Sequence, residues 1–151
     1  MAIVFFSGLW LSSLLVGREE EKVGRVASLV RLVQETKNAV ENYSMPASQI
    51  LLAAWPELIR SCGYKGEAIP KSFLEMSENL DSGDLESNGV FFEFARDFGK
   101  NYRGSQTQSC EACAMRLKAR YVELSGELAM KRRLIRCVCL SLSLFAIILL
   151  L

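Results

Sequence analysis

Two cysteines spaced as a CxxC pair, Cys110 and Cys113, are the only residues whose types and spacing suggest catalysis. A redox CxxC pair lies at the start of a helix beside a β-strand, where the thiol pKa is lowered. No segment of this sequence alternates polar and apolar residues over a useful length, so no such strand is predicted. We favour the interpretation that the two thiols lie on one helix by chance. A membrane-anchored thiol redox protein or sensor using the pair remains an alternative.

The rest of the chain offers little catalytic chemistry. It has five cysteines and no histidine, so a zinc site at the CxxC pair would depend on Cys62, Cys137 or Cys139 for its other ligands. A Ser/His or Cys/His pair is excluded, and no glycine-rich phosphate loop is present. Cys137 and Cys139 are either acylated thiols or apolar packing residues. We predict no catalytic, cofactor-binding or metal-binding residue and no enzymatic activity.

Charged residues are confined to the middle of the chain. Residues 1–17 and 137–151 carry no charged side chain, so all 18 basic and 17 acidic residues lie in residues 18–136. A helix over residues 134–151 would be ~27 Å long, near the ~30 Å thickness of a bilayer's hydrocarbon core. We therefore predict an N-terminal transmembrane anchor at 1–17, a cytoplasmic helical bundle at 18–136 and a C-terminal transmembrane anchor at 137–151.

Each anchor has an alternative. A cleaved signal peptide would carry Lys or Arg near its start, but no basic residue precedes Arg18, so an uncleaved anchor is favoured. The first segment would be only ~25 Å long, and whether it spans the bilayer fully is open. The C-terminal segment has a buried core helix as its alternative, which is disfavoured because a soluble domain rarely ends on an apolar face with no polar residue beyond it.

The charges beside the anchors predict the orientation. Arg18, Lys22 and Arg25 follow the first anchor, and a basic cluster at residues 131–136 precedes the second. The positive-inside bias places the middle domain in the cytoplasm, and the odd number of cysteines suits free thiols in that reducing compartment. The phenylalanines lie mostly in the acidic part of the chain, residues 57–99, rather than among these basic residues. We therefore predict an integral membrane protein that does not bind nucleic acid.

Apolar residues recur at helical spacing through the middle domain, which predicts an all-α fold. Breaks are expected at Ser44–Pro46, with Ser44 as the helix N-cap, and at the turn Asp81–Asp84. The carboxylates of residues 75–97 are interpreted mostly as solvated helix faces. The predicted helices cover residues 19–43, 46–54, 57–62, 70–80, 90–98 and 105–151.

The last of these helices is expected to continue directly into the membrane. Its soluble half carries two apolar rows on opposite sides. One side would pack on the chain's own bundle. The other would face another subunit or be buried in a larger bundle, and both alternatives stay open. The small-sided row is Ala112, Met115, Ala119, Val122, Gly126 and Ala129, and the bulky row is Leu117, Tyr121, Leu124 and Leu128.

The order of these segments resembles the stage III sporulation protein AB family of endospore-forming bacteria. The resemblance is carried by the amphipathic stretch VASLVRLVQETKNAVENY, the break at Ser44–Pro46, the following helix and the final apolar run. The family's "fG…lG.sD…Q" stretch is similar to Phe98-Gly99, Gly104-Ser105 and Gln108. Two departures stand out: Gln106 replaces the aspartate, and residues 136–139 replace a small, Gly-containing entry to the last membrane helix.

The resemblance implies a function that composition does not. The family is similar to inner-membrane platform proteins of type II secretion and type IV pilus systems. It implies a platform subunit, required for sporulation, in a secretion-like channel between mother cell and forespore. The subunit would lie in the mother-cell membrane at the septum, beside a secretion-type hexameric ATPase and other channel subunits. Self-association would fit the apolar row of the last helix that does not pack on the chain's own bundle. A helical scaffold in an unrelated membrane complex is a further alternative.

Overall fold

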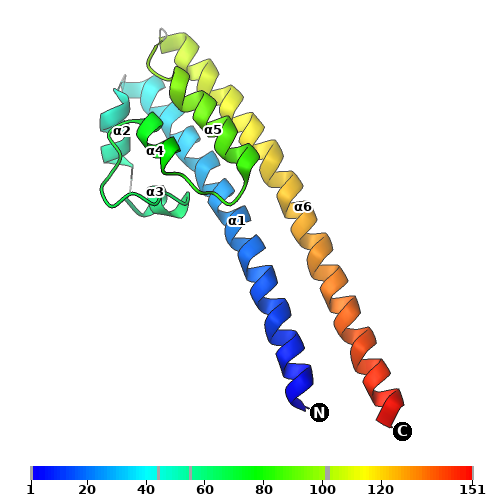
Figure 1. Ribbon diagram of the computed structural model, residues 1–151. Coiled ribbons are helices and arrows are strands. Elements are labelled where there is room, and N and C mark those ends of the chain that lie inside the picture. The colour runs from blue at the N-terminus through cyan, green and yellow to red at the C-terminus, as the bar shows by residue number, and fades with distance from the viewer. Residues whose placement is uncertain (1, 44, 55, 101–102, 151) are drawn as a thin grey trace. The chain divides into compact units, whose positions relative to one another are not determined.

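The chain folds into six helices over the part that is described. The computed structural model describes residues 2–43, 45–54, 56–100 and 103–150, without the side chains of residues 2–15, 103, 139–140, 143–144 and 146–150. Within these ranges no strand forms, and a single antiparallel bridge joins Tyr64 and Leu80. The predicted all-α fold is confirmed. The helices are α1 (Ala2–Tyr43), α2 (Ala47–Ala53), α3 (Pro56–Ser61), α4 (Phe73–Glu78), α5 (Leu85–Asp97) and α6 (Arg103–Leu150) (Figure 1).

Two compact units make up the chain. The bundle unit is Lys22–Val122, and the terminal unit combines Met1–Glu21 with Glu123–Leu151. The bundle unit holds the short helices and most of the buried residues. No helix among the described residues is long and apolar enough to cross a membrane. The predicted anchors, and their boundaries at residues 17 and 137, therefore stay predictions.

The core of the bundle unit gathers one apolar stripe from each long helix around the short ones. On α1, Leu29, Leu32 and Val33 are fully buried, which agrees with the predicted amphipathic pattern. The ring of Phe73 on α4 lies 5.6 Å from the ring of Phe94 on α5 and 4.8 Å from that of Phe98. Such edge and tilted aromatic pairs add to the free energy gained by burial. In Figure 1, α4 accordingly lies beside α5.

Several helices begin at residues other than those predicted. Ser72 rather than Pro70 starts α4, because its hydroxyl accepts a 3.1 Å hydrogen bond from the Glu75 amide as an N-cap. At α2 the N-cap position belongs to Pro46, and the predicted N-cap Ser44 lies outside the described residues. Helix α5 begins five residues earlier than predicted, and α6 begins at 103 rather than 105.

The helix predicted over residues 57–62 ends before Gly63, since α3 covers Pro56–Ser61. Gly63 follows α3 and adopts φ +92°, a left-handed conformation that L side chains rarely adopt. Its amide donates to the Arg60 carbonyl at 2.9 Å, and its carbonyl accepts from the Asp81 amide at 3.0 Å. A Cβ at this position would collide with the carbonyl of Asp81. The left-handed turn and this close approach both require glycine.

Candidate functional site

The turn at residues 81–84 places a buried carboxylate at the start of α5. Gly83, with φ +81°, lets the chain reverse, and its amide donates to the Asp81 carboxylate at 3.1 Å. Asp84 is then the N-cap of α5: its Oδ2 accepts from the amide of Ser87 at 3.0 Å and from the hydroxyl of Ser87 at 2.7 Å. Only 5% of the Asp84 side chain is exposed. The expectation that residues 75–97 carry solvated carboxylates is wrong at this residue.

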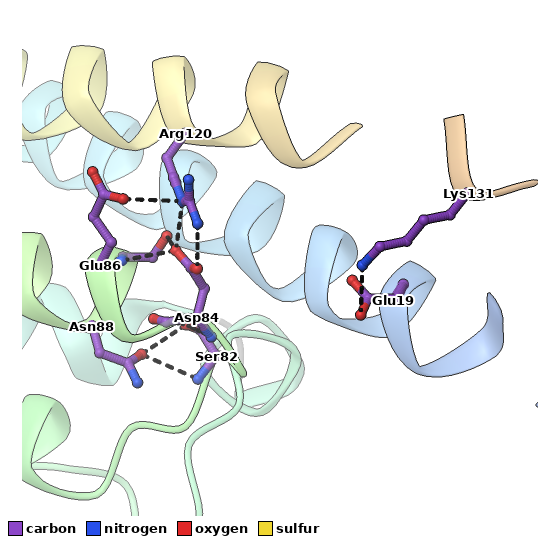
Figure 2. Close-up of polar contacts among 8 residues, drawn as sticks. Glu19, Ser82, Asp84, Glu86, Asn88, Arg120 and Lys131 are labelled. Carbon is purple, nitrogen blue, oxygen red and sulfur yellow. Dashed lines mark hydrogen bonds and ion pairs between the residues drawn. The ribbon is translucent and has the colours of Figure 1, made fainter. Parts of the chain in front are cut away.

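Arg120 on α6 binds that carboxylate in a fork (Figure 2). Its Nε lies 3.1 Å from Oδ2 of Asp84 and its Nη2 lies 2.9 Å from Oδ1. The guanidinium, 19% exposed, also lies 3.4 Å from the carboxylate of Glu86. The hydrogen bond from Arg120 is the largest cause that holds the pKa of Asp84 well below its usual range, and the bonds from Ser87 add to it. Asp84 is therefore a permanent anion at neutral pH.

A second set of hydrogen bonds fixes the turn itself. The amide and hydroxyl of Ser82 lie 3.2 Å and 2.7 Å from Oδ1 of Asn88, and the same hydroxyl lies 3.1 Å from the carbonyl of Asp84 (Figure 2). Among the described side chains, every buried nitrogen or oxygen has a partner. The cluster is a clamp between the start of α5 and the middle of α6. Ser87 is fully buried, so this serine does not face a substrate.

The CxxC pair lies on the inward side of α6. Cys110 is fully buried, Cys113 is 5% exposed, and both belong to the core of the bundle unit. Burial raises the pKa of Cys110 to about 11 and that of Cys113 to about 12. Cys62, also buried, has a pKa raised to about 12 for the same reason. Reactive cysteines have lowered pKa values, so these surroundings suit packing residues.

The remaining sequence candidates are not brought together. Cys137 is exposed, and the side chain of Cys139 lies outside the described residues. Within the described part of the chain, no three metal-binding side chains converge. An open groove of about 420 Å³ between α1 and α6 exposes Lys37 and Lys118, but Lys37 is engaged by Glu111 at 2.5 Å.

Two ion pairs lie just outside the predicted anchors, on the side of the predicted middle domain and within the terminal unit. Nζ of Lys131 on α6 lies 3.2 Å from Oε1 of Glu19 on α1 (Figure 2), and Arg132 pairs with Glu20. All four side chains are at least one-third exposed. Exposed ion pairs contribute little to the free energy of folding. These two nevertheless show that residues 19–20 of α1 lie beside residues 131–132 of α6. Helix α1 runs through residue 19 without a break, although the sequence predicts a helix start there, and the predicted basic cluster lies beside Glu19 and Glu20 within it.

The structure assigns different surroundings to the two apolar rows of α6. In the bulky row Leu117 and Leu124 are buried, while Tyr121 and Leu128 are partly buried. All six residues of the small-sided row are exposed, with Met115 at 67% and Val122 at 62%. The alternative in which the chain's own bundle buries both rows is therefore wrong. The small-sided row is an exposed apolar face.

Sequence reasoning missed the clamp. An aspartate in a turn before an apolar helix is a signal for an N-cap, and it identifies Asp84. Nothing local identifies Arg120, which lies 36 residues further along the chain. Comparison with models of known protein families, with curated proteins and with solved structures gives no match.

Proposed function

We propose that this chain is a non-catalytic platform subunit, anchored in a membrane at both ends, of a secretion-like channel complex. The proposal combines apolar ends without charge, a charged helical bundle between them and the resemblance to the stage III sporulation protein AB family. In the terms of that resemblance, the complex joins mother cell and forespore and is required for sporulation. The subunit lies in the mother-cell membrane at the septum, and its bundle faces the cytoplasm.

The observation that carries the proposal is the two salt bridges, Lys131–Glu19 and Arg132–Glu20, next to the apolar ends. Glu19 and Glu20 follow the first apolar segment after Arg18, and Lys131 and Arg132 precede the second. Two anchors that enter one bilayer side by side require their flanking residues to lie at one level. The two salt bridges hold these flanking residues of α1 and α6 next to each other, as such an arrangement requires. The basic residues around them suit the cytoplasmic side of a membrane.

The buried clamp and the buried thiols support a structural role for the bundle. Asp84 and Arg120 neutralise each other, and Cys110 and Cys113 have raised pKa values, so these ionisable groups are poorly suited to catalysis. The bundle instead offers an exposed apolar face on α6 and an acidic region in residues 57–99 to partners. Other channel subunits and a secretion-type hexameric ATPase are the partners that the resemblance implies.

Membrane fractionation tests the first half of the proposal. The full chain should remain in the membrane pellet after washing at alkaline pH and should be released only by detergent. A variant that ends before residue 137 should be released more readily, because it retains only the short first anchor. Release of the intact chain by the alkaline wash would refute double anchoring.

Detergent pull-down from sporulating cells tests the second half. The tagged chain should recover a hexameric ATPase and other membrane subunits, and the same tag on an unrelated membrane protein is the control. Recovery of a monomer without partners contradicts the platform role. Uniform membrane localisation instead of septal localisation would favour the alternative of a scaffold in an unrelated membrane complex.

The thiol redox alternative has its own test. Replacing both Cys110 and Cys113 by serine removes the CxxC chemistry. The platform proposal expects sporulation to persist if the protein still accumulates. Loss of sporulation with normal accumulation and normal partner recovery would favour the redox alternative.

A further inference from the structure

The exposed apolar face of α6 has a regular spacing. Its members, called the α6 outer face below, follow one another at intervals of three and four residues along a single helix. All six are exposed, including two large apolar side chains. The face spans ~27 Å of helix. The members are Ala112, Met115, Ala119, Val122, Gly126 and Ala129.

We propose that the α6 outer face is where two copies of this chain pair, with their α6 helices parallel and in register. The alternation of three and four is the spacing of a coiled-coil seam. One set of seam positions holds Ala112, Ala119 and Gly126, and the other holds Met115, Val122 and Ala129. Small residues at every second position let two helix axes approach to about 8 Å, so the larger side chains of both copies meet between them.

Charge complementarity supports a second copy as the occupant. Glu111 and Lys118 flank the seam on one side, and Arg116 and Glu123 flank it on the other. In a parallel pair each residue of the first set faces the residue five positions later in the other copy. Glu111 then faces Arg116 of the second copy, and Lys118 faces Glu123. Each contact occurs twice by symmetry, and no like charges face each other.

These charges already have contacts within one copy. Glu111 lies 2.5 Å from Lys37, and Arg116 lies 2.6 Å from Glu93. These pairs are largely on the surface, where ion pairs are weak and can be shared or exchanged. The flanking charges therefore select the register more than they set the affinity.

The parallel direction rests on the proposed function. Two copies anchored in the same membrane with the same orientation present α6 in the same direction. An antiparallel pair would place their C-terminal segments at opposite ends. The face is also small: a stable interface uses roughly 20 to 30 residues on each side. Pairing therefore depends on the high local concentration that a shared membrane provides.

Cysteine cross-linking in membranes tests the pairing. The full chain carries Cys137→Ser and Cys139→Ser, and Val122→Cys is compared with Leu52→Cys. Leu52 on α2 is a matched control, since it is 66% exposed and Val122 is 62% exposed. We expect Val122→Cys to form a disulfide-linked dimer under mild oxidation at least about tenfold faster than the control, as a membrane dimer raises the effective concentration.

A charge swap tests register and direction. Lys118→Glu should weaken dimerisation about tenfold, since it places like charges opposite each other twice. Adding Glu123→Lys should restore it. Equal cross-linking of Val122→Cys and Leu52→Cys overturns the pairing. If adding Glu123→Lys to Lys118→Glu does not restore dimerisation, the parallel register is overturned. The same follows if Val122→Cys in one copy forms a cross-link only with Ala119→Cys in the other. Alkaline washing of the same variants reports anchoring separately, so loss of the anchor and loss of the dimer are distinguished.

Discussion

Replacing Arg120 by methionine should destabilise the bundle unit far more than the loss of an exposed ion pair. Methionine keeps the apolar stem of the side chain but leaves Asp84, 5% exposed, without the two N–H donors at 3.1 Å and 2.9 Å. Breaking a buried pair costs about 3–5 kcal/mol. Arg120 is 19% exposed and the bonds from Ser87 remain, so we expect the low end, about 3 kcal/mol.

Arg116→Met is the matched control on the same helix. Arg116 pairs with Glu93 at 2.6 Å, but both side chains are more than half exposed. Its loss should cost no more than about 0.5 kcal/mol. Asp84→Asn completes a double-mutant cycle, because asparagine caps a helix as well as aspartate does. The double variant Asp84→Asn/Arg120→Met should be about 2 kcal/mol more stable than the sum of the single effects predicts.

The buried cysteines provide the assay. Cys62, Cys110 and Cys113 react with a thiol reagent only when the bundle opens, so their alkylation rates give the free energy of opening in detergent. Cys137→Ser and Cys139→Ser remove the other thiols. Equal effects of Arg120→Met and Arg116→Met would refute the clamp. Simple additivity in the cycle would refute direct coupling between Asp84 and Arg120.

Three further predictions follow from individual residues. The folded-state pKa of Asp84 is lowered, so the contribution of its carboxylate to stability is present above the unfolded pKa of about 3.9. This contribution is lost as the pH falls towards the folded pKa. Acid unfolding followed by circular dichroism should therefore show a weaker pH dependence in Asp84→Asn than in the unchanged chain. Phe73→Ala should cost about 3–5 kcal/mol in the alkylation assay, because the ring is buried among three other phenylalanines, and a cost under about 1 kcal/mol would contradict the packing described. Gly63→Ala should destabilise the chain by more than about 1 kcal/mol, with its midpoint of thermal unfolding lowered, and an unchanged midpoint would show that the left-handed turn can be replaced.

Much of the fold follows from local signals in the sequence. The apolar period of α1, the stop at Gly63 and the turn at residues 81–84 predict where helices run and where they end. The error at the start of α4 occurs because neighbouring side chains compete for the first amide groups of a helix. Pro70 is a plausible first residue for α4, but the hydroxyl of Ser72 captures the Glu75 amide and fixes the start there.

The clamp and the sides of α6 could be predicted only in part. Asp84 has a capping signal, whereas its partner Arg120 is brought close by packing between α5 and α6. The spacing on α6 identifies two apolar rows but does not say which one the bundle covers. Volume decides between them: Leu117 fills the core, while a row rich in alanine and glycine has little apolar area to bury.

Septal localisation during sporulation tests the proposed function most directly. An antibody against the bundle unit, applied to permeabilised sporulating cells, should label the membrane around the forespore and not the rest of the mother-cell membrane. The label should stay there in the Cys110→Ser/Cys113→Ser variant, since the proposed role needs no thiol chemistry. A diffuse cytoplasmic label, or an even label over all membranes, would contradict the account.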